Sequence, residues 1–131
     1  MAGLNKEEIA TLSEIAGLII PASAAYDVPG ADDPAIMAGI VAAANRDPAA
    51  IRAALEAFIA ADSAEVFRSG HPAHASRLQT IVAFAYYRDR RVLASLSAEA
   101  RAPFPNGYEV EQGDTAALDR VRSRGPIWRK V

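Results

Sequence analysis

Two Asp-Pro pairs constrain the fold of this chain more than any other feature of its sequence. Each pair combines two helix-start signals, because an aspartate accepts hydrogen bonds from the free amides of a first helical turn and proline suits the first helical position. Asp33-Pro34 and Asp47-Pro48 lie close together in the chain. The sequence therefore predicts short helices, one from Pro34 to about Asn45 and the next beginning at Pro48.

An earlier helix start has a similar signature. Asn5 is a good N-cap, and Glu8 stands three residues later, as in a capping box. Pro21 ends this first helix, because proline restricts the residue before it and donates no backbone hydrogen bond. Apolar residues at helical spacing predict its buried face. These residues are Ile9, Leu12, Ile15, Ala16 and Ile19.

Two further helices follow a break around Gly70. One is expected from about Pro72 to Asp89 and a shorter one from about Arg90 to Ser97. About 30 alanines favour helix formation and let helix axes approach closely. The sequence thus predicts an all-α fold, with a compact bundle of four to five alanine-rich helices over residues 1–100. Beyond the first helix, its expected core comprises Ile36, Met37, Ile40, Val41, Ile51, Leu55, Phe58, Ile59, Leu78, Ile81, Val82, Ala85, Val92, Leu93 and Leu96.

The character of the sequence changes after Ala100. Residues 101–131 contain three prolines, three glycines and three large aromatic residues, with one short helix expected, capped by Asp114 and running through Leu118 and Val121. A long irregular segment is usually either disordered or functional, and disordered segments are poor in aromatic residues. We therefore predict a long irregular, extended C-terminal tail that binds a partner. The aromatic residues expected to contact that partner are Phe104, Tyr108 and Trp128.

Side chains that could catalyse a reaction are scarce. The chain has no cysteine, so it forms neither a disulfide framework nor a Cys-based zinc site. It also lacks a phosphate-binding glycine loop and a nucleophile elbow. Asp32-Asp33 is a carboxylate pair, but its second member is already explained as an N-cap. We expect no catalytic residue, no metal and no cofactor in this chain.

His71 and His74 are the only histidines. They stand three residues apart at an expected helix start, so both could face one metal ion. They could equally be an exposed or capping pair, because His-x-x-His without a third ligand is an unspecific motif. A small metal-dependent enzyme built on the two histidines is the less favoured alternative.

The densest group of aromatic and charged residues spans Tyr86 to Arg91. Arginine stacks on tyrosine and binds carboxylates with paired hydrogen bonds, and both residue types are enriched at binding hot spots. The same residues also suit a helix end, where cations are favoured and tyrosines pack at the margin of a core. Both interpretations stay open. As a partner-binding site, the group would use Tyr86, Tyr87, Arg88, Arg90 and Arg91.

Charge and hydropathy limit the classes of partner. The net charge is −2; residues 1–68 carry four basic and ten acidic groups, and residues 69–131 carry ten basic and six acidic groups. This polarity can orient a partner, but a nucleic-acid binder would carry a denser basic stripe. The longest nearly uncharged run, Ile15 to Tyr26, contains a proline and falls short of the roughly 20 residues of a membrane span. We expect no nucleic acid partner and no membrane insertion.

Two stretches resemble a known family. LNKEEIATLSEIAGLIIPASAAYDVPGADD, residues 4–33, resembles the start of the gluconate 2-dehydrogenase subunit 3 family, in which a helix ending in Ile-Pro leads into a loop with a Pro-Gly-Ala turn. Ile20-Pro21 and Pro29-Gly30-Ala31 occupy those places in this sequence. YYRDRRVLASLSAEARAPFPNGYEVEQGD, residues 86–114, is similar to the tail of small proteins related to that family. Together the stretches cover about half of the chain.

The resemblance implies a function. Members of the family are small helical subunits that accompany a large flavoprotein dehydrogenase subunit of the glucose-methanol-choline class, and the FAD and the catalytic base belong to that large chain. The resemblance thus implies a non-catalytic accessory subunit of a sugar or alcohol dehydrogenase complex, a hetero-oligomer in which it stabilises or matures the catalytic subunit. A stand-alone helical protein-interaction module is the alternative.

The N-terminal sequence bears on localisation. Many family members carry a twin-arginine signal, which this sequence lacks, and MAGLNKEE has acidic residues where a signal peptide would be basic. We therefore expect a soluble, cytoplasmic protein, which would be periplasmic only if it were exported with a partner.

Overall fold

All regular secondary structure in the described part of the chain is helical. The computed structural model describes residues 3–97, 107, 113 and 116–125. Apart from seven helices, these residues form one isolated β-bridge, between Ser23 and Val28. The all-α fold expected from the sequence is confirmed. The chain divides into two units, residues 1–100 and 101–131, and each is described by itself.

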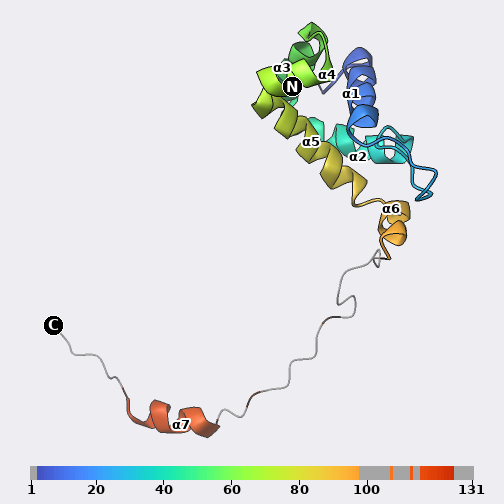
Figure 1. Cartoon of the computed structure of the whole chain (residues 1–131). Helices are drawn as coiled ribbons and strands as arrows, with labels where there is room; N and C mark the ends of the chain where they lie inside the picture. Colours follow the sequence, from blue (N-terminus) through green and yellow to red (C-terminus); the bar gives the residue numbers. More distant parts are fainter. Residues whose placement is uncertain (1–2, 98–106, 108–112, 114–115, 126–131) are drawn as a thin grey trace, which may run out of the picture. The chain divides into compact units, whose positions relative to one another are not determined.

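The first unit is organised around its longest helix. Its described helices are α1 (Lys6–Ile19), α2 (Pro34–Ala44), α3 (Pro48–Ala60), α4 (Ala64–Gly70), α5 (Pro72–Tyr86) and α6 (Arg90–Ser95). In Figure 1, α5 runs from α3 and α4 at one end to α6 at the other. It contacts α1, α2, α3 and α4. Helix α5 is therefore the element that holds the first unit together.

The helix starts follow the capping signals of the sequence. The side chain of Asn5 accepts a hydrogen bond from the Glu8 amide (2.9 Å), and the Glu8 carboxylate accepts one from the Asn5 amide (2.7 Å), which completes the capping box. The side chain of Asp33 accepts a hydrogen bond from the amide of Ala35 at 3.0 Å. Asp47 accepts from the amide of Ala50 at 3.2 Å. All three predicted starts are confirmed.

The core lies between α5 and the helices around it. Its most deeply buried large side chains are Leu12, Ile40, Leu78, Val82 and Val92, all of which the helical spacing predicted. Two predicted core residues are exposed instead, Ile59 at 68% and Leu96 at 60%. Ile59 lies about 100° around its helix from Phe58, which faces the core, and Leu96 follows the last residue of α6.

Helix α4 is the one described helix of the first unit that the spacing of apolar residues did not predict. Ser63 caps it, accepting a hydrogen bond from the Val66 amide at 3.2 Å. Helices α4 and α5 are separated only by His71, so the predicted break around Gly70 is a short kink between two helices. Helix α5 ends at Tyr86, three residues before the predicted end, and Asp89 caps α6 through the Arg91 amide (2.9 Å).

The second unit contains α7 (Ala116–Ser123). This helix contains Leu118 and Val121, so the short helix predicted through these residues is confirmed. Their side chains are 50% and 56% exposed. The predicted cap of this helix, Asp114, lies outside the described residues. In the described part of the chain, no helix is both long enough and apolar enough to cross a membrane.

Candidate partner-binding surface

The segment from Tyr86 to Arg91 connects α5 to α6 and is held against the loop that follows α1. Tyr86 is buried, and its hydroxyl donates a hydrogen bond to the carbonyl oxygen of Pro29 at 3.2 Å. Burial, and then the nearby Tyr87 and Asp89, raise the pKa of this hydroxyl. Tyr86 therefore keeps its proton at neutral pH and fixes the Pro29 turn to the end of α5.

Arg91 ties the starts of two helices together. Its guanidinium donates two hydrogen bonds to Asp33, the cap of α2 (2.8 and 3.2 Å), and two to Asp89, the cap of α6 (both 3.0 Å). These bonds are the main reason that the pKa of each carboxyl lies below its usual 3.8, and the carboxylates raise the pKa of Arg91, Asp89 more than Asp33. Arg91 is still half exposed.

The other three residues predicted for this site face solvent. Tyr87 is 53% exposed, and its ring stands edge-on to the ring of Tyr86, with the two ring centroids 5.3 Å apart. Arg88 and Arg90 are exposed. Among the residues that the structure describes, neither arginine has an ion-pair partner. Two residues of the predicted site, Tyr86 and Arg91, are therefore bonded within the chain. The other three have exposed side chains that a partner could contact.

A shallow hollow lies between the loop and α6. Its volume is about 720 Å³. The loop contributes Tyr26, Val28 and Pro29, and α6 contributes Arg91, Ala94 and Ser95. Tyr26 is 77% exposed, so this hollow, which we call the loop hollow, offers an aromatic side chain on the loop that Tyr86 bonds at Pro29.

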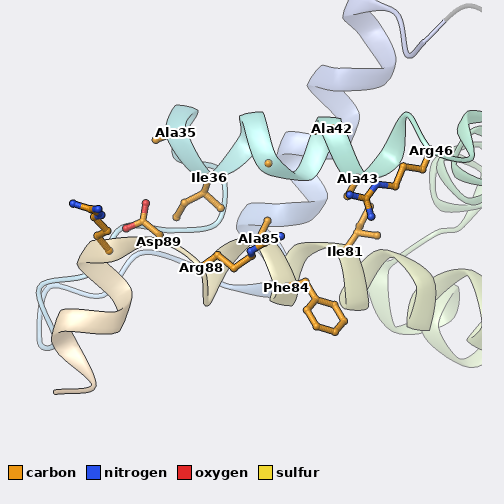
Figure 2. Close-up of a pocket in the computed structure, with 12 residues that line it drawn as sticks. Ala35, Ile36, Ala42, Ala43, Arg46, Ile81, Phe84, Ala85, Arg88 and Asp89 are labelled. Carbon is orange, nitrogen blue, oxygen red and sulfur yellow. The ribbon is translucent and has the colours of Figure 1, made fainter. Parts of the chain in front are cut away.

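A second concavity, the α2–α5 groove, has a volume of about 790 Å³ (Figure 2). Helix α2 contributes Ala35, Ile36, Gly39, Ala42 and Ala43. Helix α5 contributes Ile81, Phe84 and Ala85, and the lining beyond the ends of these two helices comprises Arg46, Arg88, Asp89 and Arg90. Figure 2 shows Phe84 pointing away from α2 and Arg46 reaching from the end of α2 towards α5. Phe84 is 71% exposed.

Sequence reasoning missed the groove, although one signal could have found it. Residues 34–44 contain no polar side chain, and a helix that is apolar all round is normally buried. Helix α2 buries one face through Ile36, Met37 and Ile40, whereas Ala35 and Ala42 are exposed. The uniformly apolar sequence of this helix thus indicated a face that stays exposed among the residues that the structure describes.

The remaining candidate residues are placed as follows. The rings of His71 and His74 lie 5.9 Å apart between centroids, and the ring of Phe67 lies 6.1 Å from that of His71. Within the described ranges, no three His, Asp or Glu side chains are grouped so that they could hold a metal ion. Asp32 is exposed. The predicted tail contacts, Phe104, Tyr108 and Trp128, lie outside the described residues.

The chain was compared with protein families, curated proteins and solved structures. No family model matches the chain, and no curated protein or solved structure gives a significant match.

Proposed function

We propose that this chain is the non-catalytic small accessory subunit of an FAD-dependent dehydrogenase complex of the glucose-methanol-choline class. In that complex it stabilises or matures the large catalytic subunit, which carries the flavin. The proposal takes its partner from the resemblance of residues 4–33 and 86–114 to the gluconate 2-dehydrogenase subunit 3 family and its relatives.

The observation that carries the proposal is the meeting of the two resembling stretches. They are far apart in the sequence, yet Tyr86 of the second bonds to Pro29 of the first, and Arg91 bonds to Asp33. All four residues that make these contacts lie in the two stretches that resemble the family. The likeness therefore concerns one connected structural feature, which supports a shared way of presenting the loop hollow.

The surface around this feature suits a protein partner. Tyr26 and Tyr87 expose 77% and 53% of their surface, and Leu96 exposes 60%. Tyrosine is among the residues that contribute most at protein interfaces. Burying each such side chain would contribute about 1.5–3 kcal/mol. A flavoprotein surface that covers them would gain affinity without any catalytic group from this chain.

Co-purification tests the proposal. The full chain, tagged and expressed with its genomic neighbours, should retain a flavoprotein, seen as flavin absorbance in the eluate and identified by mass spectrometry. Tyr26→Ser should reduce the amount retained about tenfold, because it removes an exposed aromatic contact. Val66→Ser is the matched control: Val66 is 49% exposed but lies on α4, so retention should not change.

The opposite result is equally specific. If the wild-type chain retains no flavoprotein under these conditions, the accessory-subunit proposal is wrong. Retention of a different, non-flavin protein would favour the stand-alone interaction module.

A further inference from the structure

We propose that the α2–α5 groove binds an acidic amphipathic helix of a partner protein. The inference rests on the proposed function, since it names the kind of segment that the large subunit would place on this chain. It uses a surface separate from the loop hollow, and the groove does not include Tyr26 or Tyr87.

The first step in the argument is the shape of the groove floor. The exposed face of α2 is built from the smallest side chains, Ala35, Gly39 and Ala42. Small side chains let a neighbouring helix approach closely, because the distance between helix axes depends on the side chains at the contact. From Ala35 to Ala44 the face extends about 13 Å at 1.5 Å per residue. A helix of two to three turns therefore matches the floor.

The second step is an apolar anchor at the lip. Phe84 exposes 71% of its surface beside this floor. No aromatic contact is recorded for it among the described residues. A leucine-rich stripe on the incoming helix would cover the alanines of α2, and Phe84, whose ring points away from α2, would contact the outer edge of the incoming helix. This contact is the helix-in-groove mode of recognition, in which apolar residues recur at helical spacing.

The third step is the charge of the ends. Arg46 lies at one end of the groove, and Arg88 and Arg90 lie towards the other. In the part of the chain that the structure describes, these three arginines have no ion-pair partner. The only acidic lining residue, Asp89, is already bonded to Arg91. The groove thus presents unpaired positive charge around an apolar floor, which favours glutamate or aspartate beside the stripe of the bound helix.

A peptide pair tests both features. The acidic probe is an alanine-based helix of about 15 residues with leucines along one face and glutamates beside them. The basic probe replaces every glutamate with lysine. Fluorescence anisotropy with the full chain should give at least about tenfold tighter binding of the acidic probe. Raising the salt concentration should weaken that binding, because exposed charges are screened.

Substitutions on α2 locate the binding. Ala42→Glu places a negative charge on the floor and should weaken the acidic probe about tenfold or more. Ala38→Glu is the matched control, because Ala38 is also an exposed alanine of α2 but does not line the groove. It should leave the affinity within about twofold. Equal melting curves for both variants would show that each remains folded.

The charge preference is tested at one arginine. Arg88→Glu should bind the acidic probe more weakly and the basic probe more tightly than the wild-type chain does. Arg124→Glu, which changes an exposed arginine just after α7, should change neither affinity. Equal binding of the two probes, or acidic binding that survives Ala42→Glu, would overturn the inference.

Failure of this inference and failure of the proposed function give different results. A chain that retains its flavoprotein but binds neither probe refutes only the groove. A chain that binds the acidic probe but retains no flavoprotein refutes only the identity of the partner. A wild-type chain that dimerises in solution, and becomes monomeric with Ala42→Glu, would make the groove a contact between two copies and would also overturn the inference.

Discussion

The loop hollow and the α2–α5 groove both include residues of the segment from Tyr86 to Arg91, but these residues have different contacts in the two places. Around the loop hollow, Tyr86 and Arg91 use their polar groups within the chain and fix the backbone of the loop. Along the groove, Phe84, Arg88 and Arg90 are left exposed. The difference shows that neighbouring residues of one type, such as Arg90 and Arg91, can differ in role: Arg91 is bonded within the chain, whereas Arg90 is exposed.

The largest expected effect separates two aromatic residues of α5. Tyr86→Ala should lower the free energy of unfolding by about 3–5 kcal/mol, because it empties a buried site. Phe84→Ala should change it by less than about 0.5 kcal/mol, because Phe84 is exposed. Urea unfolding followed by circular dichroism measures both. Similar losses in the two variants would mean that the groove lip is part of the core.

The next effect tests how tightly the loop is packed. A Cβ atom added at Gly30 would lie 2.9 Å from the Ala22 backbone nitrogen and would also collide with the Asp32 carboxylate. Gly30→Ala should therefore cost about 1–3 kcal/mol of unfolding free energy.

The matched control for this substitution is Gly70→Ala. The Cβ atom at Gly70 would meet nothing within 4 Å, and this helical position should gain up to about 1 kcal/mol from alanine. Thermal unfolding of the two variants should therefore shift in opposite directions. A stable Gly30→Ala variant would show that the loop hollow adapts its shape.

A smaller effect isolates the hydroxyl of Tyr86. Tyr86→Phe keeps the buried ring but removes the hydrogen bond to Pro29. It should therefore lower the free energy of unfolding by about 1 kcal/mol. Tyr87→Phe serves as the control, since Tyr87 is 53% exposed, and it should stay within about 0.5 kcal/mol of the wild type. A neutral Tyr86→Phe would mean that packing alone positions the loop.

The smallest effect is a dependence on pH. Arg91 lowers the pKa of Asp33 and Asp89 below 3.8, so both carboxylates contribute stability above that value. This contribution is lost as the pH falls through the lower values of the folded state. In Arg91→Gln, the urea midpoint of unfolding should fall less than in the wild type when the pH is lowered from neutral to below about 4. Arg90→Gln should keep the wild-type drop, and a drop of wild-type size in Arg91→Gln would contradict the assignment.

Much of the first unit could be predicted because its signals are local. Asn5, Asp33 and Asp47 each cap a helix through an amide two or three residues away, and such contacts form wherever the chain later packs. Helix α4 was missed because a seven-residue helix is too short to establish a period. The burial of Ile59 was wrongly predicted because periodicity does not say how wide a face the neighbouring helices cover.

The candidate site could be predicted only as a group of residue types. The segment from Tyr86 to Arg91 was identified as either a binding site or a helix end, and the structure shows that Tyr86 and Arg91 have structural contacts while Arg88 and Arg90 remain exposed. No rule of composition could assign those roles, because Tyr86 and Arg91 find their partners 57 and 58 residues earlier in the chain.

The sequence by itself determined where most helices begin, since capping depends on atoms only a few residues apart. It also determined that α2 would be apolar on every side. Only the tertiary structure decided which side of α2 is exposed among the described residues and which arginine is bonded to two carboxylates. Both depend on how α5 brings distant segments together, and packing over such separations is a property of the whole folded unit.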